Sequence, residues 1–353
     1  MRITANQVTL ARLVLLPVPV AMIYRHTHAM MLGALGIYIL LGLTDALDGY
    51  LARKHGSTPL GALLDPVVDK IFLVAGYVPL ADFQILPTTL VALLFIREVA
   101  VTALRSIALE EGFRFTTSTI AKLKTTVQMA GAGFILLIWL FPDDRPILTI
   151  LGAATAAAAI PAIVALARGR KPSWMAWSAL AWIGAILAVR AVLPAGAAIL
   201  VILIAIVALT VYTGLEYAWG MRRVLGTRFR RSPLEAVRLA GLSLAVPVFY
   251  LPALDRPDDP TVAILGLLAA ELAIGGVDNS LAQSGHARGP LPDIARSGTQ
   301  AACGVILLWS LFSGGGGDIA LGATLLALAA TLAELSVRLW RHRGEFLSLR
   351  LTS

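Results

Sequence analysis

The chain has 353 residues, of which 58% are hydrophobic and only 14% are charged, and its mean hydropathy is +0.81. Soluble proteins carry about 25% charged residues, so this composition excludes an ordinary soluble globule and indicates a polytopic membrane protein. The formal net charge of +8 has a simpler source than nucleic-acid binding, because cytoplasmic loops of membrane proteins collect Lys and Arg. We therefore expect no nucleic-acid partner.

Apolar stretches of about 20 residues, long enough to cross the hydrocarbon core of a bilayer, recur along the whole chain. The alternating pattern of a membrane β-barrel is missing, so we expect an all-α fold, a polytopic bundle of about twelve transmembrane helices. The first stretch lacks a convincing signal-peptide cleavage site and is treated as a retained helix. The expected helices cover approximately residues 7–25, 30–52, 62–82, 86–108, 118–141, 146–167, 174–193, 196–220, 234–252, 261–282, 296–313 and 318–340.

The loops between these helices alternate in charge. Cytoplasmic loops carry the excess of Lys and Arg, so we expect both termini in the cytoplasm and an integral protein of the bacterial inner membrane. The basic run at 222–231 either sets this topology or lies against anionic headgroups. The basic loops lie around residues 53–54, 114–124, 168–171, 222–231, 286–288 and 338–343.

Four aspartates interrupt this apolar chain in the stretch LTDALDGYLARKHGSTPLGALLDPVVDK. Asp45 and Asp48 lie near the end of the second expected helix, and Asp65 and Asp69 lie near the start of the third. Residues three or four apart share a helix face, and the Gly- and Pro-containing reversal between the helices lets the two pairs face each other. Converging carboxylates favour Mg²⁺ or Mn²⁺, and two ions about 3.5–4 Å apart would clamp a phosphoryl displacement.

The residues around the aspartates suit a phosphorylated ligand near the cytoplasmic face. Gly49 and Ala52 leave room near the backbone, and Arg53 can bind a phosphate or brace a carboxylate. Two structural interpretations compete with an active site. Asp65, which precedes a proline, is typical of a helix N-cap, and Asp48 with Arg53 is compatible with an interfacial ion pair.

The pattern D-x2-D-G-x2-A-R-x7-G-x3-D-x3-D, from Asp45 to Asp69, resembles the signature of the CDP-alcohol phosphatidyltransferases. The resemblance implies an integral membrane enzyme that moves a phosphatidyl group from a CDP-linked lipid to an alcohol and releases CMP. It also implies a two-metal site, the last aspartate, Asp69, as general base, and a homodimer. One departure is visible, because seven residues separate Arg53 from Gly61, where close members often have one more. The missing residue bears on nucleotide contacts rather than on the metal site.

Further segments narrow the choice of acceptor alcohol. Four of them look like helices of the phosphatidylglycerophosphate synthases, a group within this family. The resemblance implies CDP-diacylglycerol as donor and glycerol 3-phosphate as acceptor. The segments are NQVTLARLVLLP (6–17), IREVAVTALRSIALEEG (96–112), AKLKTTVQ (121–128) and TVYTGLEYAWG (210–220).

Basic residues in these segments agree with a phosphorylated acceptor. An Arg in the middle of a membrane helix costs about 2.5–3.5 kcal/mol, so Arg97 is expected to face a polar cavity, with Glu98 steadying it. Arg105, Lys122 and Lys124 lie toward the cytoplasmic face and are candidates for binding the acceptor phosphate. In the competing interpretation the two lysines only follow the positive-inside pattern.

Together these residues predict a two-metal mechanism. The four aspartates hold two Mg²⁺ or Mn²⁺ ions on the diphosphate of CDP-diacylglycerol, and Asp69 takes the proton from the primary hydroxyl of glycerol 3-phosphate. The alkoxide attacks the lipid-side phosphorus, and CMP leaves. Inositol phosphate, phosphatidylglycerol and serine are alternative acceptors, and a non-enzymatic scaffold or transporter-like protein is the alternative of another class. The residues expected at the CDP part of the donor are Gly49, Ala52, Arg53 and Gly61.

Family members of this kind usually have half as many membrane helices. If TVYTGLEYAWG ends the last core helix, residues 1–220 form the catalytic domain and 142–194 form an inserted helical hairpin. In the competing interpretation the helix at 146–167 completes the core and everything after it is appended.

Residues 221–353 form a C-terminal extension of four further helices with no matching motif. Glu271 and Asp278 fall on one of these helices, where buried polar groups often mark ligand or ion paths. Packing against Arg296 or a neighbouring helix explains them equally well, so no second activity is predicted.

Overall fold

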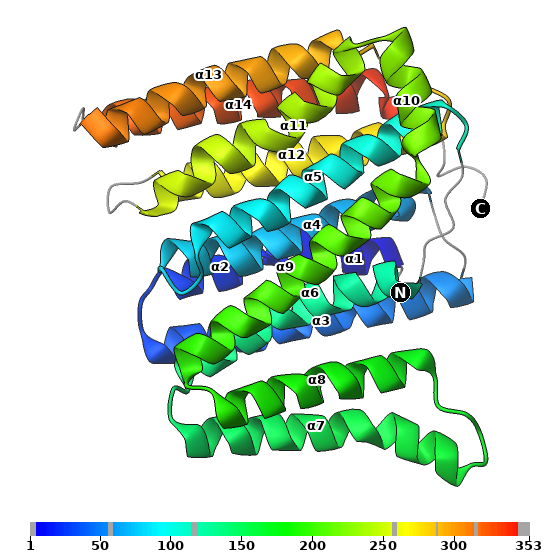
Figure 1. The fold of residues 1–353 in the computed structure, drawn as a ribbon, viewed down its shortest axis with the longest axis vertical. Helices are drawn as coiled ribbons and strands as arrows, with labels where there is room; N and C mark the ends of the chain where they lie inside the picture. The colour runs from blue at the N-terminus through cyan, green and yellow to red at the C-terminus, as the bar shows by residue number, and fades with distance from the viewer. Residues whose placement is uncertain are drawn as a thin grey trace.

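In the computed structural model (Figure 1), the backbone is described for residues 5–55, 59–113, 119–255, 260–286, 289–313 and 317–344. Within those ranges, side chains are not described for residues 5–6, 45–55, 59–63, 119–122 and 255. The regular elements of the described ranges are all helices, which confirms the all-α class. Each range expected to be helical contains a helix.

The helices follow one another with short connections. In the first half of the chain they are α1 (Ala5–Leu15), α2 (Pro17–Ile23), α3 (His28–His55), α4 (Pro59–Asp82), α5 (Thr88–Glu110), α6 (Thr119–Leu140) and α7 (Asp144–Ala167). In the second half they are α8 (Trp174–Val192), α9 (Ala195–Gly220), α10 (Arg222–Arg231), α11 (Leu234–Tyr250), the short 3₁₀ helix η1 (Leu251–Asp255), α12 (Thr261–Gln283), α13 (Leu291–Ser313) and α14 (Gly317–Arg341).

Two helices differ from the expectation. The first expected helix is divided at Leu16, because Pro17 has no backbone N–H and instead begins α2. The basic run after α9 folds into α10, where Leu225 is buried against Leu104 and Ile107 of α5. The apolar residues of this run therefore pack against α5, which its interpretation as a basic loop does not predict.

Seven helices of the described part are long and apolar enough to cross a membrane. This finding supports a polytopic membrane protein, whereas the count of twelve spans and the side of each terminus stay predictions. Helices α4, α5 and α13 are not among the seven. Each of them carries charges within an otherwise apolar sequence, for example Asp69, Arg97 and Arg296. The seven candidate spans are 123–140, 144–167, 174–192, 195–220, 234–254, 261–283 and 317–341.

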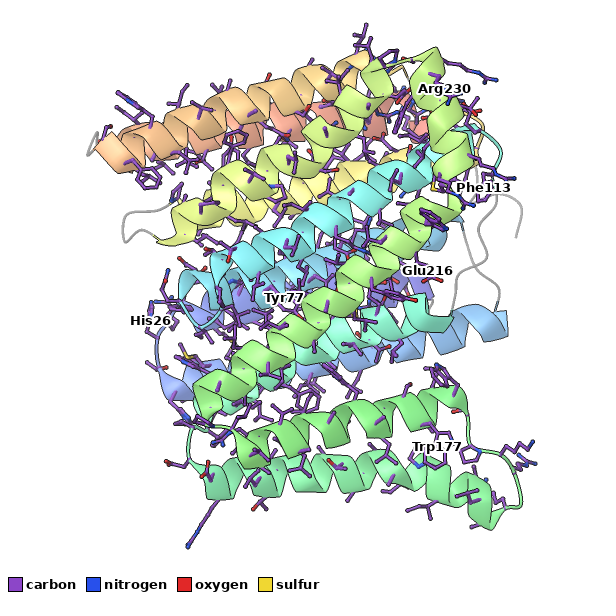
Figure 2. All side chains as sticks on the ribbon, in the orientation of Figure 1. His26, Tyr77, Phe113, Trp177, Glu216 and Arg230 are labelled. Atoms are coloured by element: carbon purple, nitrogen blue, oxygen red, sulfur yellow. The ribbon has the colours of Figure 1, made fainter. Side chains whose placement is uncertain are left out.

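The core of the first part of the chain is built around α4, α5, α6 and α9. Helices α1 and α2 pack against α3 and α4, α6 packs against α3, α4 and α9, and α9 packs against α5. Figure 2 shows Tyr77 of α4 among these central helices, while Trp177 and Arg230 lie at the periphery. The Tyr77 hydroxyl donates a hydrogen bond to the backbone carbonyl of Gln128 on α6 at 2.8 Å, which fixes the two helices against each other.

Two further units flank this core. Helices α7 and α8 pack against each other, and α8 also contacts α6 and α9, so the hairpin lies at one end of the molecule (Figure 1). Helices α11 to α14 pack together at the other end. Because α12 packs against α4 and α5, and α11 against α5, α4 and α5 form the contact between the core and the C-terminal helices.

Candidate functional site

The first helix holds the second pair of aspartates in place. The Thr9 hydroxyl of α1 donates to Asp65 Oδ1 at 3.0 Å, and Arg12 Nη1 lies 3.5 Å from Asp69 Oδ1. Thr9 and Arg12 are buried, Asp69 is half-buried and Asp65 is exposed. The two aspartates, four residues apart on α4, are therefore bound by two residues that are three apart on α1. This ladder orients both carboxylates along one face of α4.

The N-cap interpretation of Asp65 is wrong, because α4 begins at Pro59 and continues through Pro66. Asp65 thus sits inside a helix on the same face as Asp69. Its carboxylate orientation comes from Thr9 rather than from a helix end.

The remaining motif residues are placed by their backbone alone. Asp45, Asp48, Gly49, Ala52 and Arg53 lie in the last turns of α3, and Gly61 lies in the first turn of α4. Their side-chain positions fall outside the described residues, so the four-aspartate metal set stays a prediction. Among the side chains that are described, no three acids, histidines or cysteines group closely enough to hold a metal. The oxygen-only donors of Asp65 and Asp69 fit the preference of Mg²⁺ and Mn²⁺.

A buried carboxylate, Glu98 on α5, gathers three donors. Its Oε1 atom accepts from Lys124 Nζ at 2.6 Å, from Arg97 Nη1 at 3.0 Å and from Gln128 Nε2 at 3.1 Å. We call these four residues the Glu98 cluster. The contact expected between Arg97 and Glu98 is present, and Lys124 joins it from α6.

Helix α9 supports the cluster from the side opposite α4. Arg97 Nη2 donates to the Thr213 hydroxyl at 2.9 Å, and Gln128 Nε2 donates to the Thr210 hydroxyl at 2.9 Å. A Cβ added at Gly214 would lie 2.8 Å from Arg97 Cγ, so the absence of a side chain there gives the arginine its space. Thr210, Thr213 and Gly214 all belong to the TVYTGLEYAWG segment, which explains why this segment is polar inside an apolar helix.

Lys70 connects the cluster with the aspartates. It follows Asp69 on α4, and its ammonium group donates to the Thr102 hydroxyl of α5. That hydroxyl donates in turn to the backbone carbonyl of Glu98 at 2.7 Å. Because Lys70 is the chain neighbour of Asp69, these two hydrogen bonds link the aspartate face of α4 to α5 beside Glu98. The aspartates and the Glu98 cluster therefore form one continuous polar region.

The predicted phosphate-binding residues are only partly brought together. Arg97 and Lys124 converge on Glu98, whereas Arg105 is exposed two turns farther along α5, and the Lys122 side chain lies outside the described residues. Sequence reasoning missed Thr9, Arg12, Lys70, Thr102 and Gln128. The available signals were the position of Lys70 directly after Asp69 and the i, i+4 spacing of Gln128 from Lys124.

A second polar cluster occupies the extension. Arg238 Nε lies 2.7 Å from Asp293, Arg296 Nη2 lies 3.0 Å from Glu271, and Arg338 Nη2 lies 2.6 Å from Asp293. We call these five residues the extension cluster. The pairing of Glu271 with Arg296 selects the packing interpretation for that glutamate, and Asp278 forms an ion pair with Arg338.

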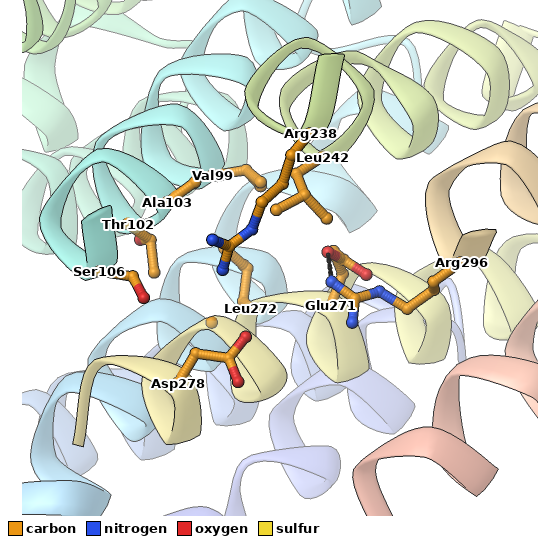
Figure 3. A pocket seen from close by; sticks show the side chains of 11 residues that line it. Val99, Thr102, Ala103, Ser106, Arg238, Leu242, Glu271, Leu272, Asp278 and Arg296 are labelled. Atoms are coloured by element: carbon orange, nitrogen blue, oxygen red, sulfur yellow. Dashed lines mark hydrogen bonds and ion pairs between the residues drawn. The ribbon is translucent and has the colours of Figure 1, made fainter. Parts of the chain in front are cut away.

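Part of the extension cluster borders a cavity of about 20 Å³ between α5 and the extension (Figure 3). This volume is enough for about one water molecule. The lining residues from α5 are Val99, Thr102, Ala103 and Ser106. Arg238, Glu271, Asp278 and Arg296 line it from the extension.

At the end of α5, Arg228 of α10 joins α5 to α11. It contacts Glu110 at 3.0 Å, Glu111 at 2.7 Å and Glu235 at 2.8 Å. Burial alone would lower the pKa of Arg228, but its hydrogen bonds to Glu235 and Glu111 raise that pKa above the ordinary value. The guanidinium therefore stays charged and holds α10 against α5.

Comparison with known proteins places this site in a family. The family model described as CDP-alcohol phosphatidyltransferase matches residues 2–164. The CDP-diacylglycerol–glycerol-3-phosphate 3-phosphatidyltransferase of Haemophilus influenzae is 36% identical over 148 residues, which cover 40% of this chain and 79% of that protein.

Two other relatives give the same picture. The probable phosphatidylglycerophosphate synthase of Mycobacterium tuberculosis is 34% identical over 154 residues, covering 42% of this chain and 73% of the relative. The CDP-diacylglycerol–glycerol-3-phosphate 3-phosphatidyltransferase of Bacillus subtilis is 31% identical over 146 residues, covering 37% and 75%. No solved structure matches the chain. With the family model and most of the length of such relatives aligned to its first half, the chain belongs to the CDP-alcohol phosphatidyltransferase family.

Proposed function

We propose that the protein transfers a phosphatidyl group from CDP-diacylglycerol to glycerol 3-phosphate, giving phosphatidylglycerol phosphate and CMP. The observation that carries this proposal is the convergence of Arg97 and Lys124 on Glu98, which Thr102 links to Lys70, the chain neighbour of Asp69. The names of the matched relatives support the same donor and acceptor.

The charge balance of the region favours a phosphorylated acceptor. Around Glu98, one carboxylate faces three cations, Arg97, Lys124 and Lys70; Asp65 and Asp69 are held by α1 and are counted with the metal ions. A phosphate monoester carries about −1.5 to −2 charges at neutral pH, which would neutralise this excess. Serine has no phosphate group and would leave this positive charge without a partner. Inositol phosphate would satisfy the same charges, and the matched relatives favour glycerol 3-phosphate over it.

The donor side rests on the aspartate motif. We assign Asp45, Asp48, Asp65 and Asp69 as ligands of two Mg²⁺ or Mn²⁺ ions, with Gly49, Ala52, Arg53 and Gly61 beside the CDP part of the donor. When bound, such ions neutralise the diphosphate and act as Lewis acids on its phosphoryl oxygens. Thr9 and Arg12 support this assignment, because they fix the direction of the Asp65 and Asp69 carboxylates.

Asp69 is the proposed general base. It accepts the proton of the primary hydroxyl of glycerol 3-phosphate, and the resulting alkoxide oxygen forms a bond to the lipid-side phosphorus. The bond from that phosphorus to the bridging oxygen breaks, and CMP leaves with the electron pair. Arg97 and Lys124 hold the acceptor phosphate, which places the hydroxyl near Asp69.

The chain organisation follows the same proposal. We assign residues 1–220 to the catalytic domain, with 142–194 as an inserted hairpin, because α9 packs beside α5 and α6 and its threonines bind Arg97 and Gln128. The competing assignment draws on the family match, which extends into α7. The basic loops support a bacterial inner-membrane protein with its active site facing the cytoplasm.

The test is an acceptor panel with the purified protein in detergent or nanodiscs. CDP-diacylglycerol and Mn²⁺ or Mg²⁺ are mixed with glycerol 3-phosphate, inositol phosphate, phosphatidylglycerol or serine in turn, and CMP release is measured. Release with glycerol 3-phosphate alone is expected. Release only with another acceptor would overturn the choice of acceptor, and release with none would overturn the activity.

A further inference from the structure

Two adjacent glycines of the extension lie directly against the catalytic helices. A Cβ added at Gly275 of α12 would lie 2.7 Å from Thr102 Cγ2 on α5, and one added at Gly276 would overlap Val67 Cγ2 on α4. Glycine weakens a helix interior relative to alanine, so a pair of them needs a packing reason. Small residues at a membrane helix interface let two backbones approach closely, and here the close approach is to α4 and α5 together.

The register between α12 and α4 is fixed over a long distance. The Thr261 hydroxyl at the start of α12 donates to Asp82 at the end of α4 at 3.1 Å. Gly276 meets Val67 fifteen residues farther along each helix, about 22 Å from that hydrogen bond at 1.5 Å per residue. The two helices are therefore antiparallel and in contact at both points, so α12 cannot slide along α4 without breaking one of them.

The two residues touched by the glycines belong to the site's framework. Val67 lies two residues from both Asp65 and Asp69 on α4. Thr102 uses its hydroxyl to accept from Lys70 and to donate to the Glu98 carbonyl, while its methyl group faces Gly275. A β-branched side chain has few accessible χ1 rotamers. Displacing the methyl therefore also displaces the hydroxyl that holds Lys70.

Thr102 is also exposed to the cavity of Figure 3, where it lies near Ser106 and across from Asp278. On the side of the cavity no atom of the described residues holds the Thr102 side chain, so its position depends on the neighbouring residues that contact it. Gly275, which lines the same cavity, provides such a contact against the methyl group.

We propose that the C-terminal extension is a positioning element of the active site: Gly275 and Gly276 set the positions of Thr102 and Val67, and Thr102 thereby holds Lys70 beside the acceptor phosphate. Gly275, Gly276 and Thr102 are positioning residues, because they act through Lys70 and α4. The role of Lys70 as a third cation for the acceptor phosphate rests on the proposed function.

The first test is Gly275→Ala, together with the double variant Gly275→Ala/Thr102→Ser. The added methyl displaces Thr102, and the KM for glycerol 3-phosphate rises about tenfold, as expected for a weakened charge-assisted contact. The KM for CDP-diacylglycerol changes less than twofold. Serine lacks the clashing methyl but keeps the hydroxyl, so the double variant recovers most of the lost affinity.

The matched control is Gly266→Ala on the same helix. Its added Cβ would meet Leu328 Cδ2 of α14 at 3.3 Å, inside the extension and at the end of a flexible side chain. Its kinetics stay those of the wild type. Where Gly275→Ala does not fold, Thr102→Val replaces it, because valine keeps the branched shape and removes only the hydroxyl. The same rise in the KM for glycerol 3-phosphate is expected.

A second readout does not require activity. Lys70 is labelled with an amine-reactive reagent and quantified by mass spectrometry, with exposed Lys171 of the α7–α8 turn as internal reference. Labelling of Lys70 rises in Gly275→Ala and in Thr102→Val, and it returns toward the wild-type level in Gly275→Ala/Thr102→Ser. Unchanged labelling in the first two variants, or a rise that Thr102→Ser does not reverse, would overturn the positioning role. A wild type that releases no CMP would instead remove the proposed function and leave the labelling result readable.

Discussion

In the Glu98 cluster a single carboxylate is surrounded by Arg97 and Lys124, with Lys70 nearby, whereas in the extension each buried arginine is bound by at least two carboxylates. Arg238 contacts Glu235 and Asp293, and Arg296 contacts Glu271 and Asp293. Arg338 contacts Asp278, Asp293 and Glu334. Both clusters are buried among apolar helices. With Lys70 included, the first has two more cations than acids, whereas the three arginines of the extension contact five of its carboxylates, Glu235, Glu271, Asp278, Asp293 and Glu334.

This difference agrees with the proposed roles, a ligand site around Glu98 and a structural cluster in the extension. An uncompensated charge away from water is costly, so a cluster that serves only packing is expected to contain its own counter-charges. The extension cluster meets this expectation. The Glu98 cluster with Lys70 does not, which agrees with the proposed binding of an anionic acceptor there.

The largest expected effect is on Asp69, the acid that precedes Lys70 on α4. Asp69→Asn removes the proposed base but keeps the shape of the side chain, so kcat should fall by about 10²- to 10⁴-fold. CMP release measures the loss, and the thermal unfolding midpoint in detergent reports on folding. Near-normal turnover would refute the base assignment. The exposed Asp144→Asn, far from the site, is the matched control.

The next largest effect is expected in the extension cluster. Arg338→Met leaves Asp278 and Asp293 with one partner fewer in a buried setting, and breaking a buried ion pair in this way costs about 3–5 kcal/mol. We expect a large drop in the thermal unfolding midpoint, with the protein that remains folded keeping its KM for glycerol 3-phosphate. A stable variant with a raised KM would mean that the extension cluster contacts the substrate.

A smaller effect is expected in the Glu98 cluster. Lys124→Met removes one cation from Glu98, while Arg97 and Gln128 still satisfy that carboxylate. Loss of the proposed hydrogen bond from Lys124 to the acceptor phosphate costs about 1.5–3 kcal/mol. We therefore expect a lower kcat/KM for glycerol 3-phosphate, with little change in stability. The exposed Lys171→Met serves as the charge-matched control. The comparison of the two clusters fails if Lys124→Met unfolds the protein without affecting kinetics.

The smallest effect comes from a pair at the molecular surface. Asp144 lies 2.7 Å from Arg190, but its side chain is 75% exposed, and Arg190 also donates to the carbonyls of Pro142 and Leu193. Exposed pairs contribute about 0.2–1 kcal/mol, so Asp144→Asn should shift the unfolding midpoint only slightly. A shift as large as that of Arg338→Met would show that burial does not decide the strength of these pairs.

The sequence predicts the helices well, because long apolar stretches between basic and non-basic loops have few other interpretations. It also predicts that Arg97 meets Glu98, since an arginine in an apolar helix must find a partner. The contact of Lys70 with Thr102 joins residues 32 positions apart, and that of Gly275 with Thr102 joins residues 173 apart. Such contacts depend on how α4, α5 and α12 are packed, which spacing along one helix does not reveal.

The contact of α5 with α11 and α12 limits where the chain can be cut. The side of α5 that faces α11 and α12 carries Ser106, which borders the cavity, and Glu110 follows at its end. A polypeptide cut after residue 220 would turn these groups toward acyl chains, which offer no hydrogen-bond partners. On this side the polar groups of α5 therefore depend on α10 to α14, which supply the contacts that lipid cannot.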